Sequence, residues 1–147
     1  MKLQTASSVI SFAKSLETES AKFYEGLAQK YAEAKEVFLS FATENNKNVV
    51  EIEREYYGVI TDAIEGCFAF DIEPEAYAIE TTLAKAVSYS DALGEAIELE
   101  EKIGKFYSDV AEQSKSLMAD VPRVFVLTAK KRNNRVAKLR SLLGKEG

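Results

Sequence analysis

The sequence predicts an all-α fold, a four-helix bundle with one long crossover between its second and third helices. Apolar residues recur at steps of three and four along four long stretches, which is the pattern of helices that bury one face. Helix breakers are rare, with 7 glycines and 2 prolines in 147 residues. The two halves of the chain also resemble each other. At this length, with 46% hydrophobic residues, we expect a single domain over 1–147.

The first two stretches predict two helices joined by a short connection. The first helix is expected over 6–32 and the second over 34–65, where Gly66 ends it. The spacing of the apolar residues predicts the inward face of each helix. The inward residues of the first helix are Ala13, Leu16, Ser20, Phe23 and Leu27, and those of the second are Phe38, Ala42, Asn45, Val49, Ile52, Tyr56 and Val59.

The other two stretches predict a second pair of helices. The third helix is expected to begin near Asp91, a candidate N-cap, and to run to residue 116. The fourth begins at "ADVPRV", where Asp120 is the candidate N-cap and Pro122 falls in the first turn, and Gly144 ends it. The inward residues are Leu93, Ile97, Glu100, Ile103, Tyr107 and Val110 in the third helix, and Phe125, Ala129, Arg132, Val136, Leu139 and Leu143 in the fourth.

The connection between the second and third helices is too long for a tight turn between antiparallel neighbours. Some 24 residues lie between Gly66 and Asp91. A segment of this length can return along the bundle, with a short helix around 79–87. Two short connections on either side of one long crossover are typical of the ferritin-like arrangement of a four-helix bundle.

The two halves of the chain repeat each other. "LETESAKFYEGLA" (16–28) aligns with "LEEKIGKFYSDVA" (99–111) at an offset of 83 residues. "FLSFATENNKNVVEI" (38–52) aligns with "FVLTAKKRNNRVAKL" (125–139) at an offset of 87 residues. Because both alignments occur in the same order and at nearly equal offsets, we infer a duplicated helical hairpin.

The composition excludes several classes of function. The chain has no histidine and one cysteine, so Ser–His–Asp and Cys–His catalysis lack their residues and any metal would need carboxylates alone. A net charge of −5 and an isoelectric point near 5.0 argue against binding to nucleic acid or anionic membranes. No apolar run is long enough to span a bilayer and the N-terminus lacks a signal-peptide pattern, so a cytoplasmic location is expected.

Charged residues occur where the helical spacing predicts a buried face. Glu17 and Glu100 hold equivalent positions in the two halves, each six residues before a Phe-Tyr pair. Arg132 lies within the inward stripe of the fourth helix, and a buried charge there needs a partner of opposite charge. Two alternatives remain, in which the glutamates reach water from the flanks of their helices or Arg132 and Arg135 reach water from a slightly rotated fourth helix. The outer face of that helix is basic, with Lys130, Lys131, Lys138 and Arg140.

The motif LExExAxFYExLA followed by a second helix, present twice in related form, resembles the rubrerythrin branch of the ferritin-like superfamily over nearly the whole chain. In that family one glutamate from each of the first and third helices, and a Glu-x-x-His motif from each of the other two, hold two irons. The resemblance implies that Glu17 and Glu100 are the retained single glutamates. The four Glu-x-x-His positions are occupied here by Asn45, Asn48, Arg132 and Arg135.

These replacements balance charge without a metal. Two carboxylates face two guanidiniums, and two added ferrous ions would leave a large positive charge in an interior of low dielectric constant. Arginine stays charged and bridges carboxylates through its planar fork, and asparagine satisfies the remaining donors and acceptors. We therefore expect Arg132 and Arg135 to occupy the region that iron fills in the family, with no cofactor.

Tyr24 and Tyr107 each follow the paired glutamate by seven residues, two turns along the same helix face. The resemblance implies that their hydroxyls hydrogen-bond across the pocket. The alternative is that they are ordinary core residues with hydroxyls near the edge of the bundle.

Two classes of function follow from these residues. The first is a non-catalytic ferritin-like domain with a structural or protein-interaction role, expected as a homodimer, with the basic outer face of the fourth helix as a docking surface for an acidic protein. The second is a rubrerythrin-like oxidoreductase or iron-binding protein that holds iron through a rearranged carboxylate set. Neither class involves nucleic acid or a membrane.

Overall fold

The computed structural model describes residues 2–59, 70–79, 81, 88–116 and 120–146. Within these ranges there are four long helices, and the strand-like pairing amounts to one isolated bridge. The helices are α1 (Ala6–Lys30), α2 (Lys35–Val59), α4 (Tyr89–Gln113) and α5 (Asp120–Glu146). None of the described helices combines the length and apolar character needed to span a lipid bilayer.

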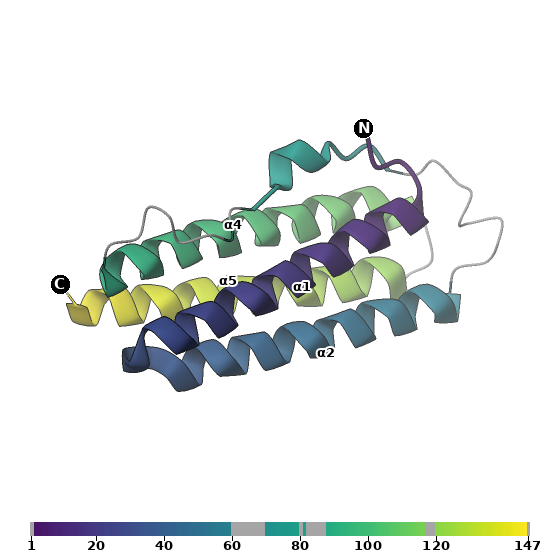
Figure 1. Cartoon of the computed structure of the whole chain (residues 1–147). Coiled ribbons are helices and arrows are strands. Elements are labelled where there is room, and N and C mark those ends of the chain that lie inside the picture. The colour runs from purple at the N-terminus through teal and green to yellow at the C-terminus, as the bar shows by residue number, and fades with distance from the viewer. Residues whose placement is uncertain (1, 60–69, 80, 82–87, 117–119, 147) are drawn as a thin grey trace.

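The helices form two antiparallel hairpins that pack against each other (Figure 1). We call α1 and α2 hairpin 1, and α4 and α5 hairpin 2. The short 3-10 helix Ala32–Ala34 joins α1 to α2. α2 lies beside α5, and α4 starts at the same end of the bundle as α2 (Figure 1). α2 therefore ends and α4 begins at opposite ends of the bundle, and the predicted all-α class with four helices is confirmed.

Local capping interactions begin the helices, and in hairpin 2 they differ from the prediction. α1 begins with a capping box, in which Ser8 N donates to Thr5 Oγ1 and Thr5 N donates to Ser8 Oγ, both at 3.2 Å. α4 is capped by Ser88, whose hydroxyl accepts from the Asp91 amide at 3.1 Å. The prediction that Asp91 is the N-cap is therefore wrong. Asp91 instead lies in the first turn, where a carboxylate interacts favourably with the helix dipole.

The ends of α5 also differ from the prediction. Asp120 is the first residue of α5 rather than its N-cap, while Pro122 lies in the first turn as predicted. Gly144 does not end the helix, which continues to Glu146. None of the described glycines has a positive φ, so Gly144 does not adopt the left-handed conformation with which glycine stops a helix. The predicted end of the second helix at Gly66 lies outside the described residues.

Part of the long connection is tied to the N-terminus and to α4. Leu3 and Ile72 form an antiparallel bridge with N–O distances of 2.7 and 3.1 Å. The 3-10 helix Pro74–Tyr77 follows, and the Tyr77 hydroxyl donates to Asp109 on α4 at 2.6 Å. The short helix predicted around 79–87 falls on a segment of which the structure describes 79 and 81, and neither of these is helical.

The two hairpins repeat the same aromatic packing. Tyr24 stacks on Phe38 with ring centroids 6.1 Å apart and planes inclined by 22°. Tyr107 stacks on Phe125 in nearly the same geometry, at 6.3 Å and 23°. The sequence offsets of 83 and 87 residues relate these two pairs, so the internal repeat is also a repeat in packing.

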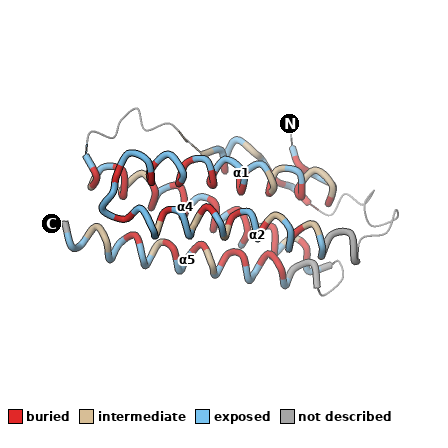
Figure 2. The backbone as a smooth tube through the Cα atoms, turned by 60° about the horizontal axis from the view of Figure 1, so that its bottom comes forward, coloured by how far each residue is buried: buried red, intermediate tan, exposed pale blue. Residues whose placement is uncertain are grey.

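Buried residues face the middle of the bundle on all four helices (Figure 2). Most of the predicted inward residues are buried, while Val49, Val136 and Leu143 are half-buried. The side chains of Tyr56 and Val59 lie outside the described part of the chain. A group of buried polar residues interrupts the apolar core, and we call it the ionic cluster: Glu17, Ser20, Asn45, Asn48, Glu100, Arg132 and Arg135.

Candidate functional site

A guanidinium group lies at the centre of the ionic cluster, between two carboxylates. Arg132 on α5 donates from Nη1 to both carboxylate oxygens of Glu100 on α4, at 3.0 and 2.8 Å. Its Nη2 donates to Glu17 on α1. All three side chains are fully buried. The alternatives in which these glutamates or Arg132 reach water are therefore wrong, because the four helices enclose the charges completely.

Burial and ion pairing act on Arg132 in opposite directions. Burial alone would lower the pKa of the guanidinium, but the negative charges of Glu100 and Glu17 outweigh it and raise the pKa well above its ordinary value. Arg132 therefore stays charged at any pH at which the bundle is folded. Desolvation of a buried guanidinium and its two carboxylate partners costs free energy, and leaving one of these charges buried without its partner costs more.

Arg135, one turn further along α5, joins the cluster to α2. It is 2% exposed and donates from Nη1 to Glu100 Oε2 at 3.3 Å. Its Nε donates to Glu44 at 3.0 Å, its Nη2 donates to the Phe41 carbonyl at 2.8 Å, and its guanidinium lies 4.8 Å from the centre of the Phe41 ring. Arg135 therefore does not reach bulk water from a rotated helix, contrary to the second alternative.

Glu44 is a member of this network that the sequence did not predict. Because Glu44 precedes Asn45 by one residue, the helical angle turns it about 100° away from the inward face of α2, which argues against Glu44 as a ligand of a central metal. Its side chain is indeed 39% exposed, but its carboxylate pairs with Arg135 at 2.9 Å. The long side chain of Arg135 on α5 extends to the Glu44 carboxylate at the edge of α2, so the two groups pair although Glu44 does not face inward.

Two tyrosine hydroxyls cross the bundle to the carboxylates. Tyr24 on α1 donates to Glu100 Oε2 at 2.5 Å, and Tyr107 on α4 donates to Glu17 Oε2 at 2.8 Å. Burial raises the pKa of both phenols well above 10, and the nearby carboxylates raise it further. The tyrosines therefore remain protonated donors. This geometry agrees with the hydrogen-bonding interpretation and excludes hydroxyls at the edge of the bundle.

Asparagine and serine side chains complete the cluster on the side of α2. Asn48 Nδ2 donates to Glu17 Oε1 at 2.9 Å, as expected for a residue that satisfies a leftover acceptor. Asn45 meets this expectation in part, since its Nδ2 donates to Ser20 Oγ at 3.0 Å while its Oδ1 is among the buried atoms without a hydrogen-bond partner. Ser20 Oγ also accepts from Arg132 Nη1 at 3.0 Å. Ser20 was predicted to face inward, but the pattern gave no sign of its polar role.

Lys131 departs from the predicted basic outer face. Its amine donates to Asn48 Oδ1 at 3.1 Å and to Glu51 Oε2 at 3.0 Å, and its side chain is 31% exposed. The other three basic residues of that face, Lys130, Lys138 and Arg140, are exposed. The aliphatic part of the Lys131 side chain lies along the edge between α2 and α5. Its amine, which was predicted to lie on the outer face, is therefore directed toward the ionic cluster.

Every carboxylate oxygen at the centre accepts at least one hydrogen bond. Glu17 Oε1 accepts from Asn48, and Glu17 Oε2 accepts from Arg132 and Tyr107. Glu100 Oε1 accepts from Arg132, and Glu100 Oε2 accepts from Arg132, Arg135 and Tyr24. Two carboxylates thus face two guanidiniums, and each oxygen through which these carboxylates could bind a metal already accepts from a side-chain donor.

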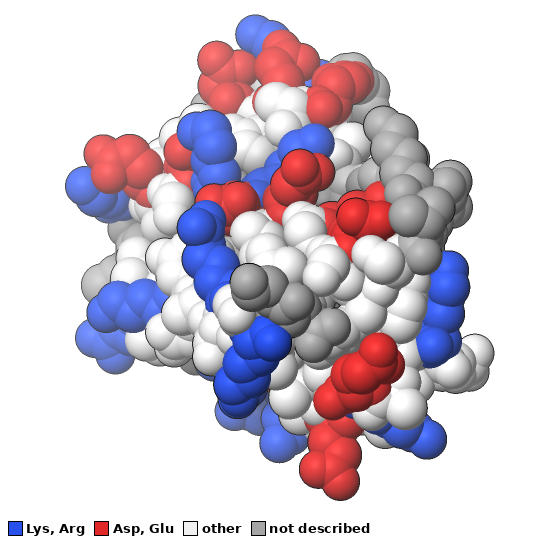
Figure 3. All heavy atoms as spheres, turned by 90° about the vertical axis from the view of Figure 1, so that its left-hand side faces the viewer, with Lys and Arg blue, Asp and Glu red and all other residues white. Residues whose placement is uncertain are grey.

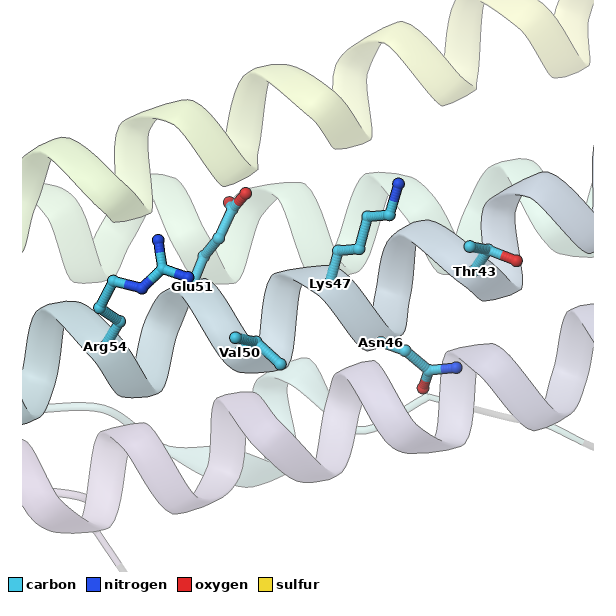
Figure 4. A pocket seen from close by; sticks show the side chains of 6 residues that line it. All are labelled: Thr43, Asn46, Lys47, Val50, Glu51 and Arg54. Carbon is cyan, nitrogen blue, oxygen red and sulfur yellow. The ribbon is translucent and has the colours of Figure 1, made fainter.

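Hollows on the outside of the bundle lie away from the central charges, and two of them are lined by residues that the structure describes. One runs along α2, and Figure 4 shows its side chains, with Glu51 directed toward α5. It is lined by Thr43, Asn46, Lys47, Val50, Glu51 and Arg54. The other lies between α4 and α5, with Val126 and Lys130 among its lining residues. Neither hollow is lined by Glu17, Glu100 or Arg132.

The fold and the site together define an all-helical bundle with a buried ionic centre. Among the residues that the structure describes, no three Asp, Glu, Cys or His side chains are grouped closely enough to hold a metal ion. No family model, curated protein or solved structure matches this chain. The contacts of the ionic cluster are therefore the basis for a functional assignment.

Proposed function

We propose that this protein is a ferritin-like bundle of the rubrerythrin type, in which fixed side-chain charges stand in place of two irons. Its role is then structural or in protein interaction rather than catalytic. The observation that carries the proposal is the position of the Arg132 guanidinium between Glu17 and Glu100. The long connection between two helical hairpins supports the ferritin-like assignment, since that arrangement places glutamates of the first and third helices at the bundle centre.

The residues at the centre do not fit a dinuclear metal site. A metal would have to displace the guanidinium of Arg132 and the hydroxyls of Tyr24 and Tyr107 from the two carboxylates. Two divalent ions would then lie beside two buried guanidiniums, where like charges repel strongly at low dielectric constant.

The second candidate is a rubrerythrin-like oxidoreductase or iron-binding protein, favoured by the retained pair Glu17 and Glu100. It requires Arg132 to leave the centre and further carboxylates to enter. The nearest additional acid in the network is Glu44, which is already paired with Arg135. This candidate therefore needs a rearrangement of α2 and α5 side chains.

Iron loading distinguishes the two candidates. The purified protein is incubated anaerobically with ferrous ion, desalted and assayed for bound iron, then exposed to oxygen while its absorbance is followed. We expect no stoichiometric iron and no absorbance of an oxo-bridged pair. Tight binding of two irons per chain, with that absorbance, contradicts the proposal and supports the oxidoreductase.

A gain-of-function variant tests the resemblance itself. The changes Asn45→Glu, Asn48→His, Arg132→Glu and Arg135→His install Glu-x-x-His in α2 and α5, and we expect this variant to bind two irons. Asn46→Glu with Asn133→Glu is the control, because it adds two acids on exposed faces of the same helices. A folded four-residue variant that binds no more iron than the control contradicts the equivalence of these positions with metal ligands.

Association through the bundle surface belongs to the same proposal. Among the side chains that the structure describes, four large apolar ones are exposed, Leu39, Val50, Val126 and Leu127. This supports contact with another protein, either a second copy or an acidic partner on the exposed cations of α5. Acidic and basic side chains are interspersed on the end of the bundle seen in Figure 3, so a docking surface is sought along the helices. A cytoplasmic location stays a prediction from the sequence.

A further inference from the structure

The ion pairs that the structure describes between the two hairpins share one polarity. Among the side chains that the structure describes, three pairs join hairpin 1 to hairpin 2: Glu17–Arg132, Glu44–Arg135 and Glu51–Lys131. In each pair the acid belongs to hairpin 1 and the cation to hairpin 2. The hairpin–hairpin interface is thus electrically polarised, although the two hairpins resemble each other in sequence and packing.

The polarity arises at positions that the internal repeat makes equivalent. An offset of 87 residues relates four positions of α2, two of them buried and two partly or fully exposed, to four positions of α5 with the same pattern of burial. The α2 residues are Glu44, Asn45, Asn48 and Glu51, and the α5 residues are Lys131, Arg132, Arg135 and Lys138. Acidic or neutral side chains in one hairpin therefore correspond to basic side chains in the other. Two copies of hairpin 1 would bring buried acids together without a cation, and two copies of hairpin 2 would bring buried cations together in excess.

We propose that the inner face of hairpin 1 is a charge-selective recognition surface for the inner face of hairpin 2, and that a second copy of this chain can enter it only by reciprocal hairpin exchange. In such a dimer, hairpin 1 of each copy packs on hairpin 2 of the other. This inference uses the observed ion pairs and the repeat, and it does not depend on a former metal site.

The chain between the hairpins is long enough for exchange. Residues 60–88 separate α2 from α4, and 29 residues can span roughly 95 Å when extended. A helix of 25 residues, such as α4, is about 37 Å long. The connection can therefore reach a neighbouring copy once the contacts of Ile72 with Leu3 and of Tyr77 with Asp109 open, because these contacts hold part of it against the bundle.

Two charge variants of the full chain test the proposal. The first carries Glu44→Lys, Asn45→Arg and Asn48→Arg, so that both hairpins are basic at the interface. The second carries Lys131→Glu, Arg132→Asn and Arg135→Asn, so that both are acidic. Alone, each is expected to lose the cooperative thermal transition or to melt roughly 10 °C or more below the parent.

Mixing the two variants restores the match through exchange. When equal amounts are unfolded and refolded together, the basic hairpin 1 meets the acidic hairpin 2, and the two unchanged hairpins meet each other. We expect a 1:1 heterodimer by native mass spectrometry, with a cooperative transition near that of the parent. When all six changes are made in one chain, the cations belong to hairpin 1 and the acids to hairpin 2. We expect this variant to fold as the parent does.

A matched control places charges on the outer face of α2, with Thr43→Lys, Asn46→Arg and Val50→Arg, where all three residues are exposed. It is expected to keep the parent's transition and to form no heterodimer with the second variant. Parent-like melting of both charge variants alone overturns the proposal. Failure of the refolded mixture to form a heterodimer, or failure of the six-residue variant to regain a cooperative transition, overturns it equally.

Discussion

Tyr24 and Tyr107 donate crosswise, each to the glutamate that precedes the other by seven residues in its own helix. The Tyr24 hydroxyl reaches Glu100 at 2.5 Å, and the Tyr107 hydroxyl reaches Glu17 at 2.8 Å. Each carboxylate is therefore held by a tyrosine from the opposite hairpin. Because Arg132 bridges the same two carboxylates and also donates to Ser20, four buried, charge-assisted interactions join hairpin 1 to hairpin 2 at the centre of the bundle.

Removal of the central cation is expected to be strongly destabilising. Arg132→Met leaves Glu17 without a cationic partner, and we expect the free energy of unfolding to fall by roughly 3–5 kcal/mol in urea titrations. Lys130→Met is the control, because Lys130 is exposed two residues away on the same helix, and it should change stability by less than about 0.5 kcal/mol. Equal stability of the two variants contradicts a buried cluster.

Removal of all four central charges is expected to be milder than removal of one. The combined changes Glu17→Leu, Glu100→Leu, Arg132→Met and Arg135→Met leave no unpaired charge in the core, and apolar replacement of complete buried ion pairs is often neutral or stabilising. The measurement is the urea midpoint of this variant against that of Arg132→Met. A lower midpoint for the fourfold variant would show that the charges contribute net stability.

The two tyrosines are expected to contribute similarly, since their environments are related by the internal repeat. Tyr24→Phe and Tyr107→Phe each remove one hydrogen bond to a buried carboxylate, at a cost of about 1.5–3 kcal/mol. Tyr77→Phe, whose hydroxyl donates to the partly exposed Asp109, should cost less. The measurement is thermal unfolding. If neither Tyr24→Phe nor Tyr107→Phe lowers the stability, the hydrogen bonds from these hydroxyls to the carboxylates are no more favourable than the hydrogen bonds to water in the unfolded chain.

Stability should fall in alkaline solution. Burial raises the pKa of Tyr24 and Tyr107 in the folded state well above the value of 10 that the unfolded chain has, and it raises the pKa of Tyr77 to about 12. The folded state therefore holds these phenolic protons more tightly, so the stabilisation is complete below about pH 10 and is lost as the pH rises through the folded pKa values. Urea midpoints across this range should decline, and the double change Tyr24→Phe/Tyr107→Phe should flatten the decline. An unchanged slope would contradict the burial of these hydroxyls.

Gly104 is expected to tolerate a side chain beside the cluster. A Cβ there would lie 3.5 Å from Asn133 Oδ1 and 3.6 Å from Arg132 Cβ, which is ordinary contact. Since glycine in a helix interior costs roughly 0.5–1 kcal/mol relative to alanine, Gly104→Ala should stabilise the protein by about that amount. Gly26→Ala, with open space around it, is the reference. Destabilisation at Gly104 alone would show that α4 and α5 need the close approach.

The helices and the centre of the site could be predicted because burial imposes a period on the sequence. The steps of three and four that place Leu16, Ile103 and Leu139 in the core also place Glu17, Glu100 and Arg132 near one another once the helices pack. Helix ends were less predictable. "SYSD" holds three residues of the capping type, Ser88, Ser90 and Asp91, and the structure uses Ser88, whose hydroxyl accepts from the Asp91 amide.

Glu44 and Lys131 were not predicted as members of the network. The helical angle gives the direction of the Cα–Cβ bond, but it does not give the position of the charged group at the end of a long side chain. Glu44 and Lys131 both begin beside the inward face, and both end at partners on the opposite hairpin. Ser20 was assigned to the core by its spacing, but its hydroxyl contacts depend on the approach of α5, which no local pattern encodes. Long-range side-chain pairing therefore had to come from the structure.

Anomalous scattering from crystals grown with excess ferrous or manganous ion tests the central claim most directly. We predict continuous guanidinium density for Arg132 between Glu17 and Glu100, without an anomalous peak at that place. An anomalous peak that shows a metal ion bound by the two glutamates, with Arg132 turned away from them, would contradict the account.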